Sequence, residues 1–413
     1  MLFKLILTIT VIYGFASSTP ITKRDVNFAW GSEKVRGVNI GGWLVLEPWI
    51  TPSIFEGLSS DIVDEYTLGE KLGAEAALKI LRPHWDTWTT FSDFQKIKDS
   101  GFNLVRIPIG YWAYDTFGSP YVQGAAPYID AAIDWARALG LKILIDLHGA
   151  PGSQNAFDNS GQRLSNPTWQ TGDTVSQTLA VLSTITTKYA SPQYADVIVA
   201  IEFLNEPLGP SLSVDTIRSF YRDAFTQLRN TSGSTLAVLH DAFQPPVSWN
   251  NFLTPSDNNA QNVAIDHHEY QVFTAPLLSM TPIQHRQQVC TGADAYSHAD
   301  KWTIVGEWTG AMTDCARHLN GRGVGARFDG TFPASTSIGD CSWRSNVALW
   351  DQQYRDDTRA YIEAQMMAFE TRTQGWVWWD FKTEGAHEWD AFKLIDEGIF
   401  PQPLGDIKFG GVC

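Results

Sequence analysis

The sequence of 413 residues has no excess of positive charge and no basic run. Its 30 Lys and Arg residues are outnumbered by 45 Asp and Glu residues, which gives a formal net charge of −15. Phosphate backbones repel so acidic a chain, so nucleic acid is excluded as a partner, whereas an uncharged polymer would not be repelled. Beyond residue 18 no stretch of about 18 residues is continuously apolar, so nothing there predicts insertion into a membrane.

Motifs that bind a cofactor or a metal are missing as well. No G-x-G-x-x-G follows the first predicted strand, 35–40, which argues against a bound dinucleotide. Asp146, His148, His267 and His268 offer possible metal ligands. Metal-dependent barrel hydrolases of the amidohydrolase type carry H-x-H in their first strand, and this strand has none. We therefore expect neither a cofactor nor a metal. Of the two adjacent histidines, we expect His267 to point away from the face that His268 serves.

The N-terminus and the few cysteines indicate secretion. Residues 1–18 contain one lysine, an apolar run and then small residues, as a signal peptide does. Residues 19–24 end in Lys-Arg, a dibasic processing signal, so we expect a short propeptide and a mature catalytic domain over 25–413. Four cysteines in a secreted chain predict two disulfides with three possible pairings. They are Cys290, Cys315, Cys341 and Cys413. A glycosylation sequon begins at Asn230, just after a helical pattern, and its occupancy is left open.

No linker or repeat divides residues 25–413, along which eight short runs rich in Val and Ile alternate with helical patterns. The predicted strands are 35–40, 103–109, 142–147, 197–204, 235–240, 262–267, 303–306 and 376–379. The clearest predicted helices are 127–139, 175–189, 214–228 and 358–373. Eight alternations predict a single-domain α/β protein with a closed (β/α)8 TIM barrel. The long segments 43–83, 148–168 and 308–349 are expected to be loops at the C-terminal face of the strands, where such barrels carry their sites.

Polar side chains recur where the predicted strands end. They are Arg106, His148, Asn205, Glu206, His268, Tyr270, Glu307 and Trp379. These strand ends converge on one rim of a barrel, so we expect the side chains to lie together. Glycoside hydrolysis needs two carboxyl groups that flank one bond, and Glu206 and Glu307 fall on opposite sides of the ring. The pattern therefore predicts a glycoside hydrolase.

Several long strings strengthen this reading. They are NIGGWLVLEPWITPS (39–53), DLHGAPGSQNAFDNSG (146–161), IEFLNEP (201–207), DHHEYQVF (266–273), GEW (306–308) and KTEGAHEW (382–389). Over about 35–403 the chain resembles the fungal secreted exo-β-1,3-glucanases of glycoside hydrolase family 5. Two departures are Glu269, where these relatives carry an aromatic residue, and Asp380-Phe381, where they carry Ser-Trp. Such extra acids would affect linkage preference and subsite affinity.

The resemblance implies a role for each site residue. Glu206 would be the acid/base and Glu307 the nucleophile, with a supporting shell of Arg106, His148, Asn205, His268 and Tyr270. The terminal sugar would be held by Glu47, Asp158, Asn320, Arg327 and Trp379. Phe157 and Phe273 would grip the glucan at the pocket mouth, unless they are packing residues. The disulfides would pair Cys290 with Cys413 and Cys315 with Cys341.

The function that these expectations favour is release of glucose from the non-reducing end of β-1,3-glucan with retention of configuration. The protein would be a monomer acting outside the cell or in its wall, with β-glucan as its partner. Two alternatives remain. An endo-acting β-1,6- or β-1,4-glucanase would need an open cleft. A wall protein that only binds glucan has no need of the two glutamates, whose presence argues against it.

Overall fold

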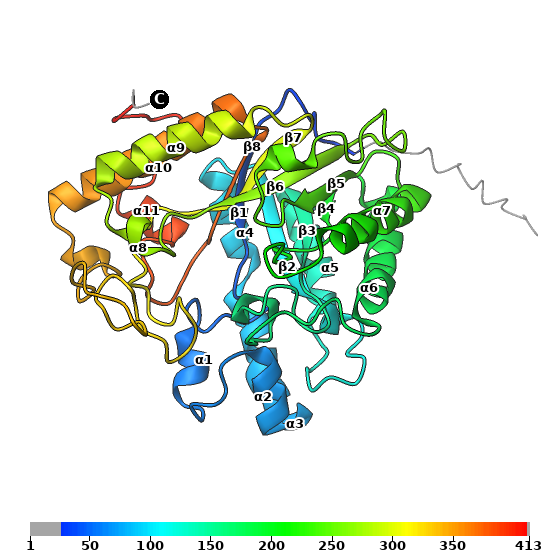
Figure 1. Cartoon of the computed structure of the whole chain (residues 1–413), viewed down its shortest axis with the longest axis horizontal. Coiled ribbons are helices and arrows are strands. Elements are labelled where there is room, and N and C mark those ends of the chain that lie inside the picture. The colour runs from blue at the N-terminus through cyan, green and yellow to red at the C-terminus, as the bar shows by residue number, and fades with distance from the viewer. Residues whose placement is uncertain (1–25, 411–413) are drawn as a thin grey trace, which may run out of the picture.

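The computed structural model describes residues 26–410, and its central feature is a closed barrel of eight parallel strands (Figure 1). The strands are β1 (Val35–Asn39), β2 (Leu104–Gly110), β3 (Lys142–Gly149), β4 (Ile198–Glu202), β5 (Leu236–His240), β6 (Val263–Glu269), β7 (Trp302–Trp308) and β8 (Gly375–Trp378). Each pairs with the next along the chain, and β1 closes the ring against β8. All eight predicted strands are present, and the predicted TIM barrel is confirmed.

The expected signal peptide and propeptide, residues 1–24, lie outside the described residues, as does Cys413. Among residues 26–410, no helix combines the length and the apolar character that a membrane span requires.

The strands are buried on both faces, as their continuous apolar runs require. Inside the ring, near the beginnings of the strands, Val35, Leu104, Leu144 and Ile304 pack into one cluster with other small and branched side chains. Phe28, from the segment before β1, packs against this cluster and covers it. The amino end of the barrel is therefore filled with apolar side chains, and the polar residues collect toward the other end.

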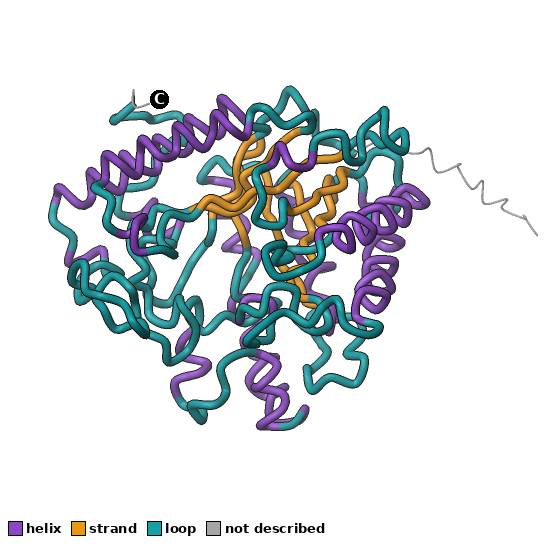
Figure 2. Tube along the Cα trace, in the orientation of Figure 1, coloured by secondary structure: helices purple, strands orange, loops and turns teal. Residues whose placement is uncertain are grey.

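The helices cover the outside of the barrel (Figures 1 and 2). They are α1 (Pro52–Glu56), α2 (Glu65–Leu72), α3 (Ala74–Trp88), α4 (Phe91–Asp99), α5 (Ala126–Leu139), α6 (Thr174–Tyr189), α7 (Val214–Thr231), α8 (Ala275–Leu278), α9 (Pro282–Tyr296), α10 (Gln352–Arg372) and α11 (Ala391–Asp396). Helix α10 begins six residues before its predicted start, because the side chain of Asp351 caps it by accepting from the Tyr354 N–H. Helix α7 continues to Thr231, so the sequon residue Asn230 lies in its last turn rather than after it, and its side chain is exposed.

The alternation of strand and helix fails once. Between β5 and β6 the chain forms a short 3-10 turn, Pro246–Trp249, and no α-helix. Two features of this segment oppose a helix. Pro245 and Pro246 lack an N–H, and several residues adopt positive φ, among them Ala242, Phe243 and Asn251.

The segment 43–83, expected to be a loop, is partly helical and contains α1, α2 and much of α3. Helix α2 has a start signal in the sequence: Asp64 accepts from the Thr67 N–H, and Thr67 bonds back to the Asp64 N–H. The segments 148–168 and 308–349 are largely irregular, as predicted, and run through the loop-rich lower part of the view in Figure 2. These three segments build the walls of the site described next.

Candidate active site

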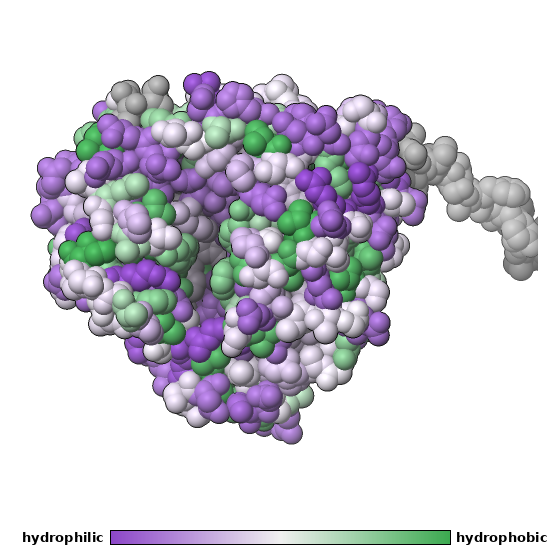
Figure 3. All heavy atoms as spheres, in the orientation of Figure 1, coloured by the Kyte–Doolittle hydropathy of each residue, from purple (hydrophilic) through white to green (hydrophobic). Residues whose placement is uncertain are grey.

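A pocket of about 600 Å³ opens at the carboxyl ends of the strands, where Figure 3 shows a hollow in the face. The predicted residues that line it are Glu47, Phe157, Asp158, Glu206, His268, Tyr270, Phe273, Glu307, Asn320, Arg327 and Trp379. Residues that were not predicted also line it, among them Trp49, Asn159, Arg163, Phe243, Phe332 and Trp389. The remaining predicted residues, Arg106, His148 and Asn205, lie beneath the pocket and are fully buried.

Arg106 of β2 lies beneath the pocket and contacts several polar side chains at once. Its Nη1 donates to Glu307 Oε1 at 2.9 Å, and its Nε donates to Glu202 Oε2 at 2.8 Å. Its Nη2 donates to Asn205 Oδ1 at 2.8 Å and lies 3.1 Å from Asp146 Oδ2. The guanidinium carries a fixed charge and planar donors, so it orients several acceptors at once. It is the residue that sets Glu307 in place.

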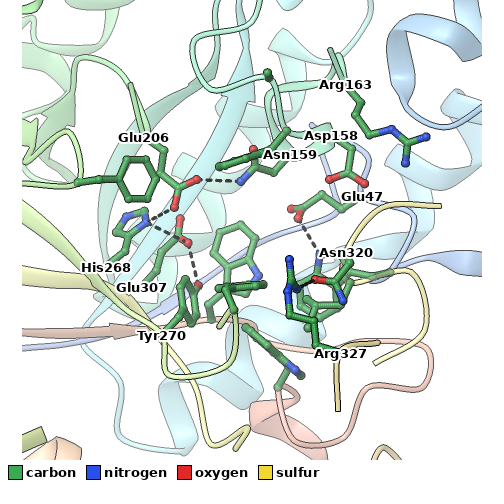
Figure 4. Close-up of a pocket in the computed structure, with 18 of the residues that line it drawn as sticks. Glu47, Asp158, Asn159, Arg163, Glu206, His268, Tyr270, Glu307, Asn320 and Arg327 are labelled. Carbon is green, nitrogen blue, oxygen red and sulfur yellow. Dashed lines mark hydrogen bonds and ion pairs between the residues drawn. The ribbon is translucent and has the colours of Figure 1, made fainter. Parts of the chain in front are cut away.

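The two candidate carboxyl groups meet at one imidazole (Figure 4). His268 Nδ1 lies 2.8 Å from Glu206 Oε1 and 3.3 Å from Glu307 Oε2, so these oxygens are at most about 6 Å apart. Tyr270 donates its hydroxyl to Glu307 Oε2 at 2.8 Å. Asn159 donates to the other oxygen of Glu206, Oε2, at 3.0 Å. Asn159 follows Asp158 in one of the strings that carry the resemblance, but the sequence alone did not show its contact with Glu206.

The backbone of Glu206 also marks it as unusual, because its φ is +48°. A residue with a side chain rarely occupies this left-handed region, and such strain is typical of functional sites. The turn directs the side chain into the pocket instead of continuing the strand direction of β4.

The charges around His268 determine how this group titrates. Burial lowers the pKa of His268, but the carboxylates of Glu307 and Asp266 outweigh burial and raise it well above its ordinary value. Burial raises the pKa of Glu307, and the charges of His268 and Arg106 offset only part of that rise. Burial acts in the same direction on Glu206, yet the hydrogen bond and the charge of His268 hold its pKa below the ordinary value. The three groups therefore share their protons as a unit.

His148 and Asn205 support the floor of the pocket. His148 Nδ1 lies 2.6 Å from Asp146 Oδ2, and its ring stacks on Trp379 with a centroid distance of 5.6 Å. This stacking orients the Trp379 ring at the floor of the pocket. The Asn205 side chain is tied to Arg106 through its oxygen, and its nitrogen lies 3.5 Å from His148 Nε2.

The far side of the pocket holds the residues expected to contact a terminal sugar (Figure 4). Glu47 Oε2 accepts from Trp49 Nε1 at 2.9 Å, and burial raises the pKa of Glu47 well above its ordinary value. Burial raises the pKa of Asp158 to about 7, although Arg163 opposes this rise. Opposite these acids, Asn320 and Arg327 are hydrogen-bonded to each other. The pocket thus combines buried acceptors with fixed donors.

Three phenylalanines are exposed at the pocket mouth. Phe157 and Phe273 are 43% and 39% exposed, and Phe243 is 42% exposed. Their exposure leaves all three rings accessible from the pocket mouth. Phe243 comes from the irregular segment after β5, where the predicted alternation of strands and helices requires a helix.

The disulfide Cys315–Cys341 is present and closes a loop with a sequence separation of 26, which confirms that prediction. Asp314 directly precedes this loop, and both of its carboxyl oxygens accept backbone N–H groups from within it, from Arg327 at 2.8 Å and from Phe328 at 3.0 Å. The bridge and Asp314 together position Arg327. The other predicted bridge, between Cys290 and Cys413, involves a residue outside the described part of the chain.

The two departures from the family pattern do not reach the pocket lining. Glu269 accepts from the Tyr296 hydroxyl and from Gln271 Nε2 at 3.1 Å. Asp380 Oδ1 accepts from the Gly41 N–H at 2.8 Å. His267 also faces away from the catalytic pair, with Nδ1 2.6 Å from Asp241 Oδ2, as the alternation of side chains along a strand predicts.

Two groups of side chains have a spacing that could hold a cation, Glu206 with His240 and His268, and Glu202 with Asp266 and His268. Both need His268 as a ligand, yet its raised pKa keeps it protonated and without a free lone pair. Arg106 Nε already lies 2.8 Å from Glu202 and 3.9 Å from Asp266, so it fills the role that a cation would have there. The donor set fits a metal poorly.

A TIM barrel whose pocket holds two facing carboxyl groups, at the ends of β4 and β7, defines a glycoside hydrolase. The model of the cellulase family, glycosyl hydrolase family 5, matches residues 70–385, and the chain belongs to this family. It is 46% identical to "Glucan 1,3-beta-glucosidase" of Schwanniomyces occidentalis over 100% of this chain and 98% of the relative. It is 47% identical to the protein of the same name from Blumeria graminis, over 96% and 93%.

Among solved structures, the rutinosidase from Aspergillus niger superposes with a TM-score of 0.71 over 90% of this chain and 99% of its own. The sequence identity is 19%, so this likeness concerns the fold.

The raised pKa of Asp158 predicts how stability changes with pH. Because the folded-state pKa is about 7 against an ordinary 3.8, the folded state holds the proton more tightly. This contribution is fully present below about pH 3.8 and is lost as the pH rises to about 7. Relative to Asp158→Asn, the unmodified protein should therefore lose up to roughly 4 kcal/mol across this window. Thermal unfolding from pH 4 to 8 measures the difference.

The exposed Asp134→Asn serves as the control and should follow the unmodified protein at every pH. A stability difference between Asp158→Asn and the unmodified protein that does not change with pH would contradict the burial argument.

Proposed function

We propose that this protein releases glucose from the non-reducing end of β-1,3-glucan, with retention of the anomeric configuration. The observation that supports this most is the contact of Glu206 and Glu307 with one nitrogen of His268, which limits their oxygens to a separation of about 6 Å. Retaining enzymes place their carboxyl groups about 5–5.5 Å apart, while inverting enzymes leave room for a water at about 6.5–9.5 Å.

The hydrogen bonds support one assignment of the two roles. Glu307 accepts from Arg106 and from Tyr270, and these two donors aim its carboxyl group and favour its ionised form, as a nucleophile requires. Its oxygen attacks the anomeric carbon as the glycosidic bond breaks, and Glu206 gives a proton to the departing oxygen. A water then attacks the same carbon and gives its proton to Glu206, which frees Glu307 and the sugar.

The directions of the two carboxyl pKa values do not by themselves identify the acid. The charge of His268 favours ionised Glu206 in the free protein, which opposes its role as a proton donor. The roles are therefore assigned from the donors around each carboxyl group, which are the charged Arg106 and Tyr270 at Glu307 and the amide of Asn159 at Glu206.

The linkage is supported by the relatives. The chain is 44–47% identical to several proteins named glucan 1,3-beta-glucosidase and covers 93–98% of their length. Because the residues that line the pocket lie throughout the matched length, the substrate of these relatives is the best guide to that of this chain.

Exo-action is supported by the far side of the pocket. Glu47, Asp158 and Arg327 would hydrogen-bond the hydroxyls of the terminal sugar, and Trp379 would stack beneath its ring. Asn205 Nδ2 would reach the 2-hydroxyl as charge develops on the ring. Phe157 and Phe273 would hold the next sugar at the mouth.

We further propose that the protein acts outside the cell or in its wall as a monomer. A signal peptide over 1–18 and a propeptide over 19–24 would be removed, Asn230 would carry a glycan, and Cys290 would pair with Cys413. The exposure of Asn230 is compatible with its modification. An endo-acting β-1,6- or β-1,4-glucanase and a glucan-binding protein remain the alternatives. The contact of both carboxyl groups with one nitrogen of His268 makes pure binding the weaker one.

The two glutamates should differ in their response to substitution. Glu307→Gln should lose activity on every substrate, because no group remains to form the covalent intermediate. Glu206→Gln should lose about 10²- to 10⁴-fold on laminarin but retain release of dinitrophenol from its β-glucoside, a leaving group that needs little protonation. Steady-state rates on the two substrates test this. Equal losses of Glu206→Gln on both substrates would contradict its role as the acid.

The products from laminarin test the proposed specificity. Glucose should be the first and only early product, since a closed pocket admits only a chain end. Glu47→Gln should lower kcat/KM about 5- to 150-fold on laminarin and on an aryl glucoside alike, because an amide cannot reproduce the hydrogen bonds of the carboxyl group and a buried partner left unsatisfied costs roughly 1–3 kcal/mol.

The double variant Phe157→Ala, Phe273→Ala is the matched comparison. It should weaken turnover of laminari-oligosaccharides more than turnover of the aryl glucoside, which is too short to engage both rings. A ladder of oligomers from the unmodified protein would show endo-action. Unchanged rates of Glu47→Gln would show that the terminal sugar does not reach this residue.

A further inference from the structure

One arginine fastens two walls of the pocket to each other. Arg322, in the loop after β7, donates through Nη1 to the carbonyl oxygens of Ser59, at 2.7 Å, and Ile62. Through Nη2 it donates to the carbonyl oxygens of Phe55 and Leu58, the latter at 3.0 Å. These four carbonyls belong to α1 and the turn that follows it, more than 250 residues away in sequence.

The loop after β3 forms a third wall of the pocket and also contacts Arg322. Arg163, which lines the pocket, donates through Nη1 to the carbonyl oxygen of Arg322 at 3.3 Å. Its backbone N–H donates to Asp64 Oδ2 at 2.6 Å, which ties it to the start of α2. Gly321 permits this contact, because a Cβ at this residue would lie 2.4 Å from Arg163 Nη1 and its φ is +105°. The position therefore requires glycine.

The fastened segments carry the residues at the far side of the pocket. Glu47 and Trp49 precede α1, Asp158 shares its loop with Arg163, and Asn320 lies two residues before Arg322. In Figure 4 Arg163 lies beside Asp158, and Asn320 lies below Glu47 in the view, next to Arg327. Four main-chain carbonyls at one guanidinium would lose their shared donor if it were removed, at a cost that favours separation of the walls.

We propose that Arg322 is the specificity-determining residue that keeps the pocket closed at its far end and so confines cleavage to the terminal sugar. This inference rests on the proposed exo-action. Arg322 acts through the walls that it joins and does not touch the reacting atoms. With the walls released, a glucan chain can pass beyond the terminal-sugar position, and the bond that reaches Glu206 and Glu307 is no longer the last one.

The test compares Arg322→Ala with Arg317→Ala, a control in the same loop whose ion pair with Glu56 is 65% and 45% exposed. Laminarin products at early times and kcat and KM on an aryl glucoside are measured for both, with thermal unfolding to show that each is folded. Arg322→Ala should raise KM by about tenfold or more. Its kcat should stay within about threefold, because the carboxyl pair is untouched. Its early products should include laminaribiose and longer oligomers.

Arg317→Ala should keep the KM and the glucose product of the unmodified protein. If Arg322→Ala is folded, releases only glucose and has an unchanged KM, the inference is overturned. Should Arg322→Ala fail to fold, Arg322→Lys keeps the charge, cannot donate to four carbonyl oxygens at once and is read by the same criteria. Failure of the proposed function looks different, because the unmodified protein itself would then yield oligomers or no glucose.

Discussion

The guanidinium of Arg106 lies without solvent exposure among the side chains of Asn39, Asp146, Glu202, Asn205 and Glu307. Burial of a charge costs several kcal/mol unless partners surround it, and here each nitrogen of the fork has an acceptor. The acids in turn depend on the guanidinium, because their side chains are buried away from bulk solvent. This mutual dependence fixes Glu307, and through His268 it also fixes the geometry of Glu206.

The barrel supplies this cluster with a rigid frame. Apolar side chains fill the amino end of the ring, so the charged layer sits directly on a packed floor. Arg106, His268 and Glu307 arise from strands, where the backbone is held by pairing on both sides. The loops after the strands supply further residues of the pocket lining. They bring Glu47, Asp158 and Arg327 around the pocket, and their contacts with each other shape its far side.

The barrel and most of the pocket residues could be predicted from the sequence, because both leave local signals in it. Parallel strands appear as runs of Val and Ile, and a polar residue at the end of such a run points to the rim of the barrel. The missing helix after β5 was not recognised, since its positive-φ residues include Ala242 and Phe243, which carry no turn signature. The contacts by which Arg322 joins two pocket walls could not be predicted either. Its four partners are main-chain carbonyls 260–267 residues away, which leave no mark in side-chain patterns.

We propose that Glu307 attacks the sugar directly from within a carboxyl pair too close for an intervening water. Proton NMR of the first glucose released from laminarin, recorded before mutarotation, tests this most directly. Two successive displacements at one carbon predict β-glucose as the initial product. α-Glucose as the initial product would mean a single displacement by water and would contradict the account.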